Sequence, residues 1–219
     1  MAKKRTNASE PRRPLNREQV LRAAVGLVDE AGLDALTMRR LGERLGVEAM
    51  SLYNHVTNKE DIVDGIAETV LLEIELPADA GDWRSAMRRR AVSVREVLSR
   101  HPWATNLIGN TAHPGEATLR YADWVLGCLM KAGFSADLAM RAFWIIDSYI
   151  FGFINQQASL GPESDEAGEH TRAQSADDYP YLIEASTTYA AGPGWDFDKE
   201  FIFGLDLILE ALERRRVDG

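Results

Sequence analysis

A helical spacing of apolar residues runs along most of the chain and limits its fold more than any other feature. Between residues 17 and 31, apolar side chains recur at every third or fourth position, as on one face of a helix: Val20, Ala23, Ala24, Leu27, Val28 and Ala31. Similar spacing recurs at 38–45, 48–54 and 59–76, and again at 82–100, 102–109, 115–132, 135–159, 178–191 and 196–215. No convincing strand alternation is visible. The sequence therefore predicts an all-α fold.

Residues with capping chemistry mark several of the expected helix ends. Asn16 is followed three residues later by Gln19, which is the spacing of a capping box. Gly32 is suited to end that helix. Thr37 is suited to begin the next helix and Gly46 to end it.

The composition changes at three places, and these changes predict the domain organisation. Residues 1–14 read as a disordered basic tail, and the turn-prone PADAGD after Leu76 closes the first helical unit. We therefore expect a small domain over 15–76 and a larger one over 77–219. Within the larger one, GPESDEAGEHTRAQSADD at 161–178 is polar, acidic and without period, which predicts a mobile loop.

Charge is unevenly distributed along the chain. Residues 1–60 hold eleven Lys and Arg against eight Asp and Glu, a net charge of +3, whereas the rest carries −12, which gives the total of −9. A basic segment on an acidic body suggests contact with a polyanion at one end. The opening segment has no apolar run after its positive charges, so we expect no signal peptide and a cytoplasmic location. Cys128 is the only cysteine, which excludes an intrachain disulfide.

The stretch TMRRLGERLGVEAMSLYNHVTNKED at 37–61 carries the strongest functional signal. A helix that ends at Gly46, a brief turn and a second short helix form the helix-turn-helix arrangement, which an αα-hairpin without a ligand also fits. The polar side chains favour DNA, because Tyr53, His55 and Lys59 can all donate hydrogen bonds to phosphate oxygens. Thr37 lies at the start of the helix at 38–45, as Lys59 lies at the start of the helix at 59–76.

The run LTMRRLGERLGVEAMSLYNHVTNKEDIVDGIAE resembles the DNA-binding head of the tetracycline-repressor (TetR) family. Farther along, GFSADLAMRAFWI with YIFGF, and EFIFGLDLILEALE, resemble the dimerising helices of its tetracycline-repressor branch. The resemblance spans about residues 15–215 and is strongest over 36–65. It implies a homodimeric repressor, with no enzymatic activity, that a small molecule releases from a palindromic double-stranded DNA operator.

The resemblance also implies roles for individual residues in the head. Arg39 would read a base edge, for which its fork geometry suits guanine O6 and N7. The side chains at the tip of the recognition helix would face bases, and a second set would hold phosphates: Ala49, Met50 and Ser51 in the first, Thr37, Tyr53, His55 and Lys59 in the second. The tetracycline branch has a polar tip where this chain has Ala49 and Met50. We therefore expect a different operator. Leu41, Leu45, Val47, Leu52 and Val56 are interpreted as the core of the head.

The expected effector site is less sharply defined. Where the tetracycline branch binds drug and magnesium through histidine, asparagine and glutamine, this chain has Glu75, Arg90, Val125 and Gly109, which argues against a tetracycline–magnesium effector. We expect neither a metal nor a cofactor, but a small organic effector held by aromatic side chains and a few polar ones: Trp103, Trp124, Phe143 and Trp144, with Arg90, Asn106, His113 and Asp147. Asp147 stands among isoleucines, and a buried carboxylate needs a partner or a ligand.

Two segments are apolar around most of their circumference, which predicts burial on two sides. These are the helices at 135–159 and 196–215, and we expect a second copy of the chain to cover their outer faces. An ordinary internal core helix is the alternative.

Two other functions remain open at this point. One is a DNA-binding dimer controlled by a protein partner through residues 161–178. The other is an all-α enzyme using Asp147 and His113, although the motifs of common enzyme classes are lacking.

Overall fold

The computed structural model describes residues 14–77, 82–108, 114–160, 179–190 and 196–217. These residues form ten α-helices and one 3-10 helix, with no strand among them, which confirms the all-α prediction. The chain divides into two compact units, residues 1–69 and 70–219. The division falls inside the helix at 59–71, whereas the sequence places the domain boundary after residue 76.

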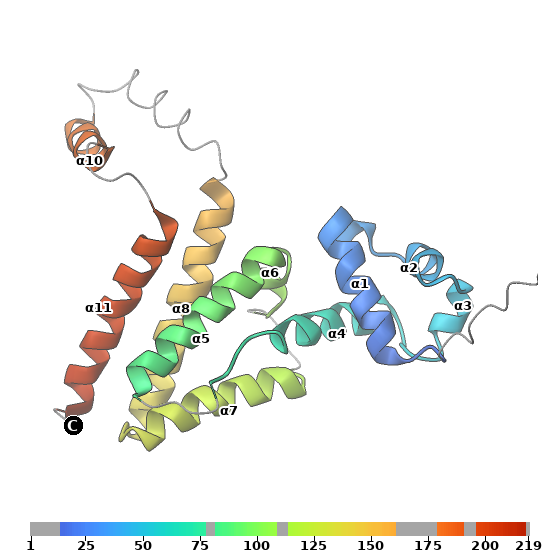
Figure 1. Ribbon diagram of the computed structural model, residues 1–219, viewed down its shortest axis with the longest axis horizontal. Coiled ribbons are helices and arrows are strands. Elements are labelled where there is room, and N and C mark those ends of the chain that lie inside the picture. Colours follow the sequence, from blue (N-terminus) through green and yellow to red (C-terminus); the bar gives the residue numbers. More distant parts are fainter. Residues whose placement is uncertain (1–13, 78–81, 109–113, 161–178, 191–195, 218–219) are drawn as a thin grey trace, which may run out of the picture. The chain divides into compact units, whose positions relative to one another are not determined.

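The first unit begins with α1 (Arg17–Ala31), a short 3-10 helix η1 (Leu33–Ala35), α2 (Met38–Leu45) and α3 (Ala49–Leu52) (Figure 1). The predicted caps are present. The Asn16 side chain accepts from the Gln19 backbone N–H and Gln19 returns the bond, while the Thr37 hydroxyl accepts from the Arg40 N–H at 3.2 Å. α4 (Lys59–Leu71) closes the unit. Its core holds side chains from all four α-helices: Val20, Ala24, Val28, Leu41, Leu52, Ile62 and Ile66.

Two helices of this unit are shorter than predicted. α3 was expected over 48–54 but covers only Ala49–Leu52, because the N–H groups of Asn54 and His55 bond three residues back, as in turns. α4 was expected to reach residue 76 but ends at Leu71, where Glu73 and Ile74 also bond three residues back. The expected core is partly correct, since Leu41, Leu52 and Val56 are buried while Leu45 and Val47 are half-buried.

The second unit is a bundle in which α8 (Ala136–Leu160) is the central helix. It packs against α5 (Trp83–Arg100), α6 (Ala104–Ile108), α7 (Glu116–Lys131) and α11 (Phe197–Val217), and α10 (Pro180–Ala190) precedes α11 (Figure 1). Tyr149 on α8 donates its hydroxyl to the backbone oxygen of Phe201 on α11 at 2.8 Å. Trp83 on α5 donates its indole N–H to Glu213 on α11 at 3.0 Å. These bonds join α11 to both α8 and α5.

α8 and α11 have apolar side chains on both an inner and an outer face. The inner residues of α8 and α11 are buried in this single chain: Ile146, Ile150 and Ile154, with Phe201, Leu205, Leu209 and Leu212. Their outer residues are exposed: Trp144, Ile145, Phe203 and Leu207. The helical spacing of Phe201, Leu205 and Leu212 predicts Ile208 on the same buried stripe, but in the structure Leu209 is buried and Ile208 is half-buried. The outer apolar faces of these two helices are therefore available to another surface.

Candidate functional site

The turn between α2 and α3 is built on two glycines. Gly46 ends α2 with φ of 67°, in the left-handed region that glycine adopts most readily. A Cβ added to Gly42 would stand 2.8 Å from the carbonyl oxygen of Val47. Real Cβ atoms do not approach oxygen so closely, so glycine lets α2 lie directly against the turn. The geometry holds α3 at a close, fixed distance from α2.

The side chains at the tip of α3 present an exposed surface. Met50 is 76% exposed and Tyr53 is 48% exposed, although both are large and partly apolar. Ala49 and Ser51 are half-buried beside them. Arg39 on α2 is also exposed and makes only a loose ion pair with Glu43, at 3.8 Å. An exposed methionine with an accessible guanidinium nearby suits contact with base edges and thymine methyl groups.

The expected phosphate contacts lie at the ends of helices. Thr37 is the N-cap of α2, and its oxygen accepts the Arg40 N–H, so its own hydroxyl hydrogen can still donate. Lys59 is exposed in the first turn of α4, and His55 is half-buried in the turn before it. With Tyr53, these four side chains supply donors of the kind that phosphate oxygens accept.

Two ion pairs hold the frame of this unit. Arg17 forms two hydrogen bonds with the Asp61 carboxylate, at 3.0 and 2.6 Å. Arg44 forms two with Glu30, at 2.7 and 2.8 Å. The Arg17 guanidinium lowers the pKa of Asp61, which also accepts the Thr57 N–H at 2.7 Å. The positive charge of Arg44 is thus engaged with α1, whereas Arg39, with its looser pair to Glu43, and Lys59 are exposed.

In the second unit, α5, α7 and α8 together bury a polar cluster of Arg90, Tyr121 and Asp147. Arg90 is completely buried, and its Nη1 donates to Asp147 Oδ1 at 2.7 Å and to the Tyr121 hydroxyl. The Tyr121 hydroxyl also donates to Asp147 Oδ1, at 3.3 Å. The Arg90 guanidinium lies 5.2 Å from the centre of the Tyr121 ring. The partner that a buried Asp147 requires is therefore Arg90.

Burial by itself lowers the pKa of Arg90 and raises the pKa of Tyr121. It is the largest single influence on Arg90 and disfavours the charged form. The charge and hydrogen bond of Asp147, with smaller contributions that include Tyr121, together outweigh that cost, and the pKa of Arg90 is raised. Burial also raises the pKa of the Tyr121 hydroxyl, which stays protonated. The cluster thus holds a guanidinium cation, a neutral phenol and the Asp147 carboxylate.

The second edge of the Arg90 guanidinium has no hydrogen-bond acceptor among the described residues. Within the part of the chain that the structure describes, Nε and Nη2 of Arg90 have no hydrogen-bond partner. These two nitrogens carry three N–H bonds, and leaving a buried donor unpaired costs about 1–3 kcal/mol. Thr105 on α6 has a similarly unpartnered buried hydroxyl among the described residues. The site therefore has spare donors in its interior.

The other residues predicted for the effector site are spread over several helices. The Phe143 ring lies 6.5 Å from that of Tyr121, and the Trp144 ring 5.7 Å from that of Phe143, so both join the cluster of Arg90 and Asp147. Trp144 itself is 64% exposed. The remaining described residues lie on other helices or in turns: the Trp103 ring is 6.0 Å from that of His101, Trp124 is half-buried on α7, and Asn106 is exposed on α6. His113 lies outside the described residues.

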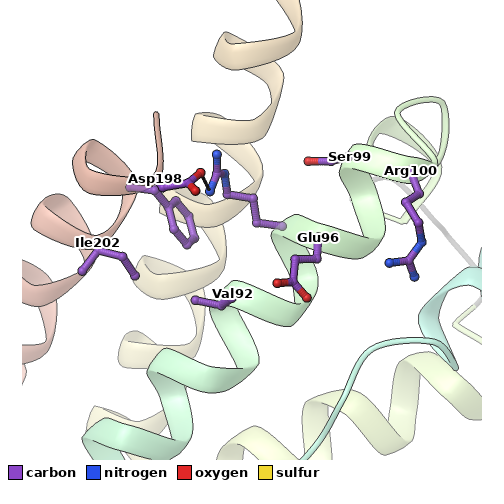
Figure 2. Close-up of a pocket in the computed structure, with 8 residues that line it drawn as sticks. Val92, Glu96, Ser99, Arg100, Asp198 and Ile202 are labelled. Carbon is purple, nitrogen blue, oxygen red and sulfur yellow. Dashed lines mark ion pairs between the residues drawn. The ribbon is translucent and has the colours of Figure 1, made fainter. Parts of the chain in front are cut away.

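A separate groove of about 460 Å³ opens between α5 and α11 (Figure 2). Its lining is Val92, Arg95, Glu96, Ser99, Arg100, Asp198, Phe201 and Ile202. Arg95 pairs with Asp198 at 2.7 Å across it and lies over the Phe201 ring, 5.3 Å from its centre. This lining shares no residue with the effector site predicted from the sequence, so the sequence did not indicate the groove.

Tyr121 is the member of the cluster that the sequence prediction missed. A signal was present, because Tyr121 stands on the same spacing as Val125, Cys128 and Leu129, which line the buried face of α7. A tyrosine on such a face needs a partner for its hydroxyl.

The described residues offer neither a metal cluster nor a membrane span. No group of three or more His, Cys, Asp or Glu side chains gathers among them to hold a metal ion. None of their helices combines the length and the apolar content needed to cross a bilayer.

The sequence matches two family descriptions that together cover most of the chain. Residues 20–66 match "Bacterial regulatory proteins, tetR family", and residues 76–216 match "Tetracyclin repressor-like, C-terminal domain". A curated relative, the tetracycline repressor protein class C of Escherichia coli, is 34% identical over 208 residues, which are 93% of each chain.

Two solved structures are also similar. One is the TetR family protein ActR of Streptomyces coelicolor in complex with (S)-DNPA, with a TM-score of 0.74 and 27% identity, covering 91% of this chain and 98% of that one. The other is a single-residue variant of TetR from Acinetobacter baumannii in complex with minocycline, with a TM-score of 0.69 and 28% identity, covering 93% and 99%.

Proposed function

The chain belongs to the tetR family of bacterial regulatory proteins, which are ligand-responsive DNA-binding repressors, and from that premise we propose how its residues carry out this function. A homodimer would bind a near-palindromic operator through α2 and α3 of each copy, and a small organic effector held in the second unit would release it. The observation that carries the proposal is the exposed tip of α3, with Met50 and Tyr53, on a helix that packs against α2, where Arg39 is also exposed. Such a regulator would act in the cytoplasm.

In the head, base reading and backbone contact would fall to different side chains. Arg39 has a guanidinium fork that can donate to two acceptors of a guanine. Ala49 and Met50 can contact thymine methyl groups but cannot donate to a purine edge, so the operator should differ from that of relatives with a polar tip. Lys59, Tyr53, His55 and Thr37 would fix the register through phosphates.

The dimer would form through the outer faces of α8 and α11. Exposed Trp144 and Ile145 on α8 and Phe203 and Leu207 on α11 give these helices an apolar surface beyond the core of the single chain. A two-fold axis would place the same surface of each copy against the other. Burial of such side chains in an interface stabilises association through the hydrophobic effect.

The relatives with bound (S)-DNPA and minocycline support a small organic effector for this chain as well. The residues that we assign to its site are Arg90, Asp147 and Phe143, which the cluster around Tyr121 brings together. The departure from the tetracycline-binding pattern at Glu75, Arg90, Val125 and Gly109 argues for an effector other than a tetracycline–magnesium complex.

The end of α4 offers a path for the signal, because the turn after it is fastened to α5. The Glu73 carboxylate accepts from Arg100 at 2.9 Å and lies 3.4 Å from the His101 ring nitrogen, and the Glu75 N–H donates to Ser93 at 2.8 Å. An effector that shifts α5 would therefore move the end of α4, whose first turn carries Lys59. The effector releases DNA only if it binds more tightly to the protein conformation that binds DNA poorly.

Selection from a random DNA pool, followed by sequencing of the retained DNA, tests this function. The expected result is a near-palindrome whose half-site centres lie about one helical turn apart. A thermal-shift screen with small organic compounds should then find a ligand that stabilises the protein and releases that DNA. The proposal would be contradicted if the protein retained no DNA sequence in preference to random DNA. If no small compound released the DNA but a protein from the same cell did, the proposed small-molecule effector would be wrong.

A further inference from the structure

The unpaired edge of Arg90 indicates the chemistry of the effector. Its guanidinium is completely buried, and its hydrogen bonds to Tyr121 and Asp147 both leave from Nη1. Nε and Nη2 have no partner within the described residues. In a guanidinium, the Nε–H and one N–H of Nη2 point the same way in one plane. They are the two donors of a single fork that can bind two oxygens side by side.

We propose that the effector is an acid whose carboxylate, or an equally planar pair of oxygens sharing one negative charge, binds the Nε and Nη2 fork of Arg90. This inference rests on the proposed function, since it names the class of ligand for the same site. A bidentate guanidinium–carboxylate pair is among the strongest and most specific hydrogen-bonded arrangements in proteins. Lysine cannot reproduce it, because an ammonium is a point charge without a fork.

The aromatic side chains near Arg90 indicate the rest of the molecule. The Tyr121 ring centre lies 5.2 Å from the Arg90 guanidinium, and the Phe143 ring follows at 6.5 Å from the Tyr121 ring. Aromatic rings favour flat, apolar ligands. An aromatic carboxylic acid therefore meets both requirements, with a carboxylate for the fork of Arg90 and a ring suited to an aromatic neighbourhood.

Asp147 has an opposite effect on such a ligand. Its carboxylate already balances the charge of Arg90 from the Nη1 side. A bound acid would place a second negative charge around the same guanidinium, and like charges at this range repel each other in a buried site. Asp147 therefore holds Arg90 in place but weakens the binding of acids. Replacing its charge while keeping an oxygen acceptor should strengthen that binding.

Calorimetric titration with matched acids and amides tests the assignment. The probes are benzoate, 2-naphthoate and anthracene-2-carboxylate, each beside its primary amide, which has the same shape but one oxygen and no charge. At least one acid should bind the wild type about tenfold or more tightly than its amide. Arg90→Lys should abolish this preference, and Asp147→Asn should raise the affinity for the acid about threefold or more. Arg88→Lys is the matched control on the same helix, because Arg88 is exposed and pairs with Asp206, and it should leave the preference unchanged.

Each contrary result overturns the proposal. If no acid binds the wild type better than its amide, the fork is not an acid site. If the preference survives Arg90→Lys, the acid binds elsewhere. If Asp147→Asn lowers the affinity for the acid, the charge of Asp147 does not oppose a carboxylate at Arg90. A titration of operator DNA with the same wild-type protein tests the proposed function separately from the acid site. A protein that binds its operator but shows no acid preference remains a repressor with another class of effector. A protein that prefers acids but binds no operator would overturn the proposed function alone.

Discussion

The two units of the molecule use their charged residues in opposite ways. In the first unit, the bidentate pairs Arg17–Asp61 and Arg44–Glu30 lie at the surface and brace helices against one another. In the second, Arg90 is fully buried against Asp147, with one edge satisfied and the other not. The surface pairs do not engage Arg39 or Lys59, which we propose to contact DNA, whereas the buried pair is part of the effector site that we propose.

This difference predicts which mutations should change DNA binding and which should change stability and ligand binding. Exposed pairs contribute little to stability, because water screens them and their side chains lose entropy on pairing. A buried pair is costly to break, because one charge then stays in the interior without its partner. We therefore expect mutations in the first unit to change DNA binding with small effects on folding. In the second unit, stability and ligand binding should change together.

The largest effect is expected for Asp147→Ala. It removes the only negative charge paired with buried Arg90 in the described chain, and the free energy of unfolding should fall by about 3–5 kcal/mol. Arg88→Ala breaks the pair with Asp206, whose two side chains are 44% and 40% exposed, and should cost at most about 1 kcal/mol. Urea denaturation at a fixed protein concentration measures both. Equal losses would show that Arg90 is not held as a buried charge.

The next effect concerns the outer faces of α8 and α11. Phe203 is 64% exposed in the single chain, so Phe203→Glu should leave its fold intact while burying a carboxylate in the dimer. We expect the dimer dissociation constant to rise about 100-fold or more, which is about 2.7 kcal/mol. Analytical ultracentrifugation of the wild type and the variant measures it.

The control for this change is Leu119→Glu, which alters a similarly exposed apolar side chain on α7. It should leave the dimer intact. If Leu119→Glu dissociates the protein and Phe203→Glu does not, the interface lies on α7 instead. Leu205→Glu is unsuitable as a test, because Leu205 is buried within the single chain and its replacement would unfold it.

The contrast between the units also explains how far the sequence could predict the structure. In the first unit, the signals are local: a capping box at Asn16, a cap at Thr37 and a helix-ending glycine at 46 all lie within a few residues of the helix ends they determine. The helix order follows from such patterns. The predictions differ from the structure where turn geometry decides, at the ends of α3, at the end of α4 and in η1, and for Leu45 and Val47, which are only half-buried.

The cluster in the second unit could not be predicted in the same way. Arg90 lies 31 residues from Tyr121 and 57 from Asp147, so its pairing depends on how three helices pack. A helical pattern places each residue on a buried face but does not tell which side chains meet across it. The sequence showed that Asp147 needed a partner. It could not show that Arg90 would be that partner and would keep one edge unpaired.

In the head, Arg39 and Lys59 should separate base reading from backbone contact. Arg39→Ala should cost about 1–3 kcal/mol at the operator and relax the choice of base at one position. Lys59→Ala should weaken binding to every sequence and reduce the salt dependence by about one unit of slope. Fluorescence anisotropy against the operator, a single-base variant and random DNA, each at several salt concentrations, gives both quantities. If both substitutions weaken all three DNAs equally, the two residues do not have separate roles.

The smallest effect is expected from the surface pair of the head, and it should depend on pH. Arg17 lowers the pKa of Asp61, so the pair stabilises the folded state above the pKa of an unfolded aspartate, about 3.9. That contribution is lost as the pH falls through the lower pKa of the folded state.

Asp61→Asn should therefore cost about 1 kcal/mol at pH 7, through the weakened pair and the weakened bond to the Thr57 N–H. The difference from the wild type should shrink toward zero as the pH falls from about 5 to about 2, because protonated Asp61 resembles asparagine. Urea denaturation followed by circular dichroism at each pH measures this difference, with exposed Asp64→Asn on the same helix as the control. A loss of several kcal/mol, or one that does not shrink in acid, would mean that the head depends on its charges as the second unit does.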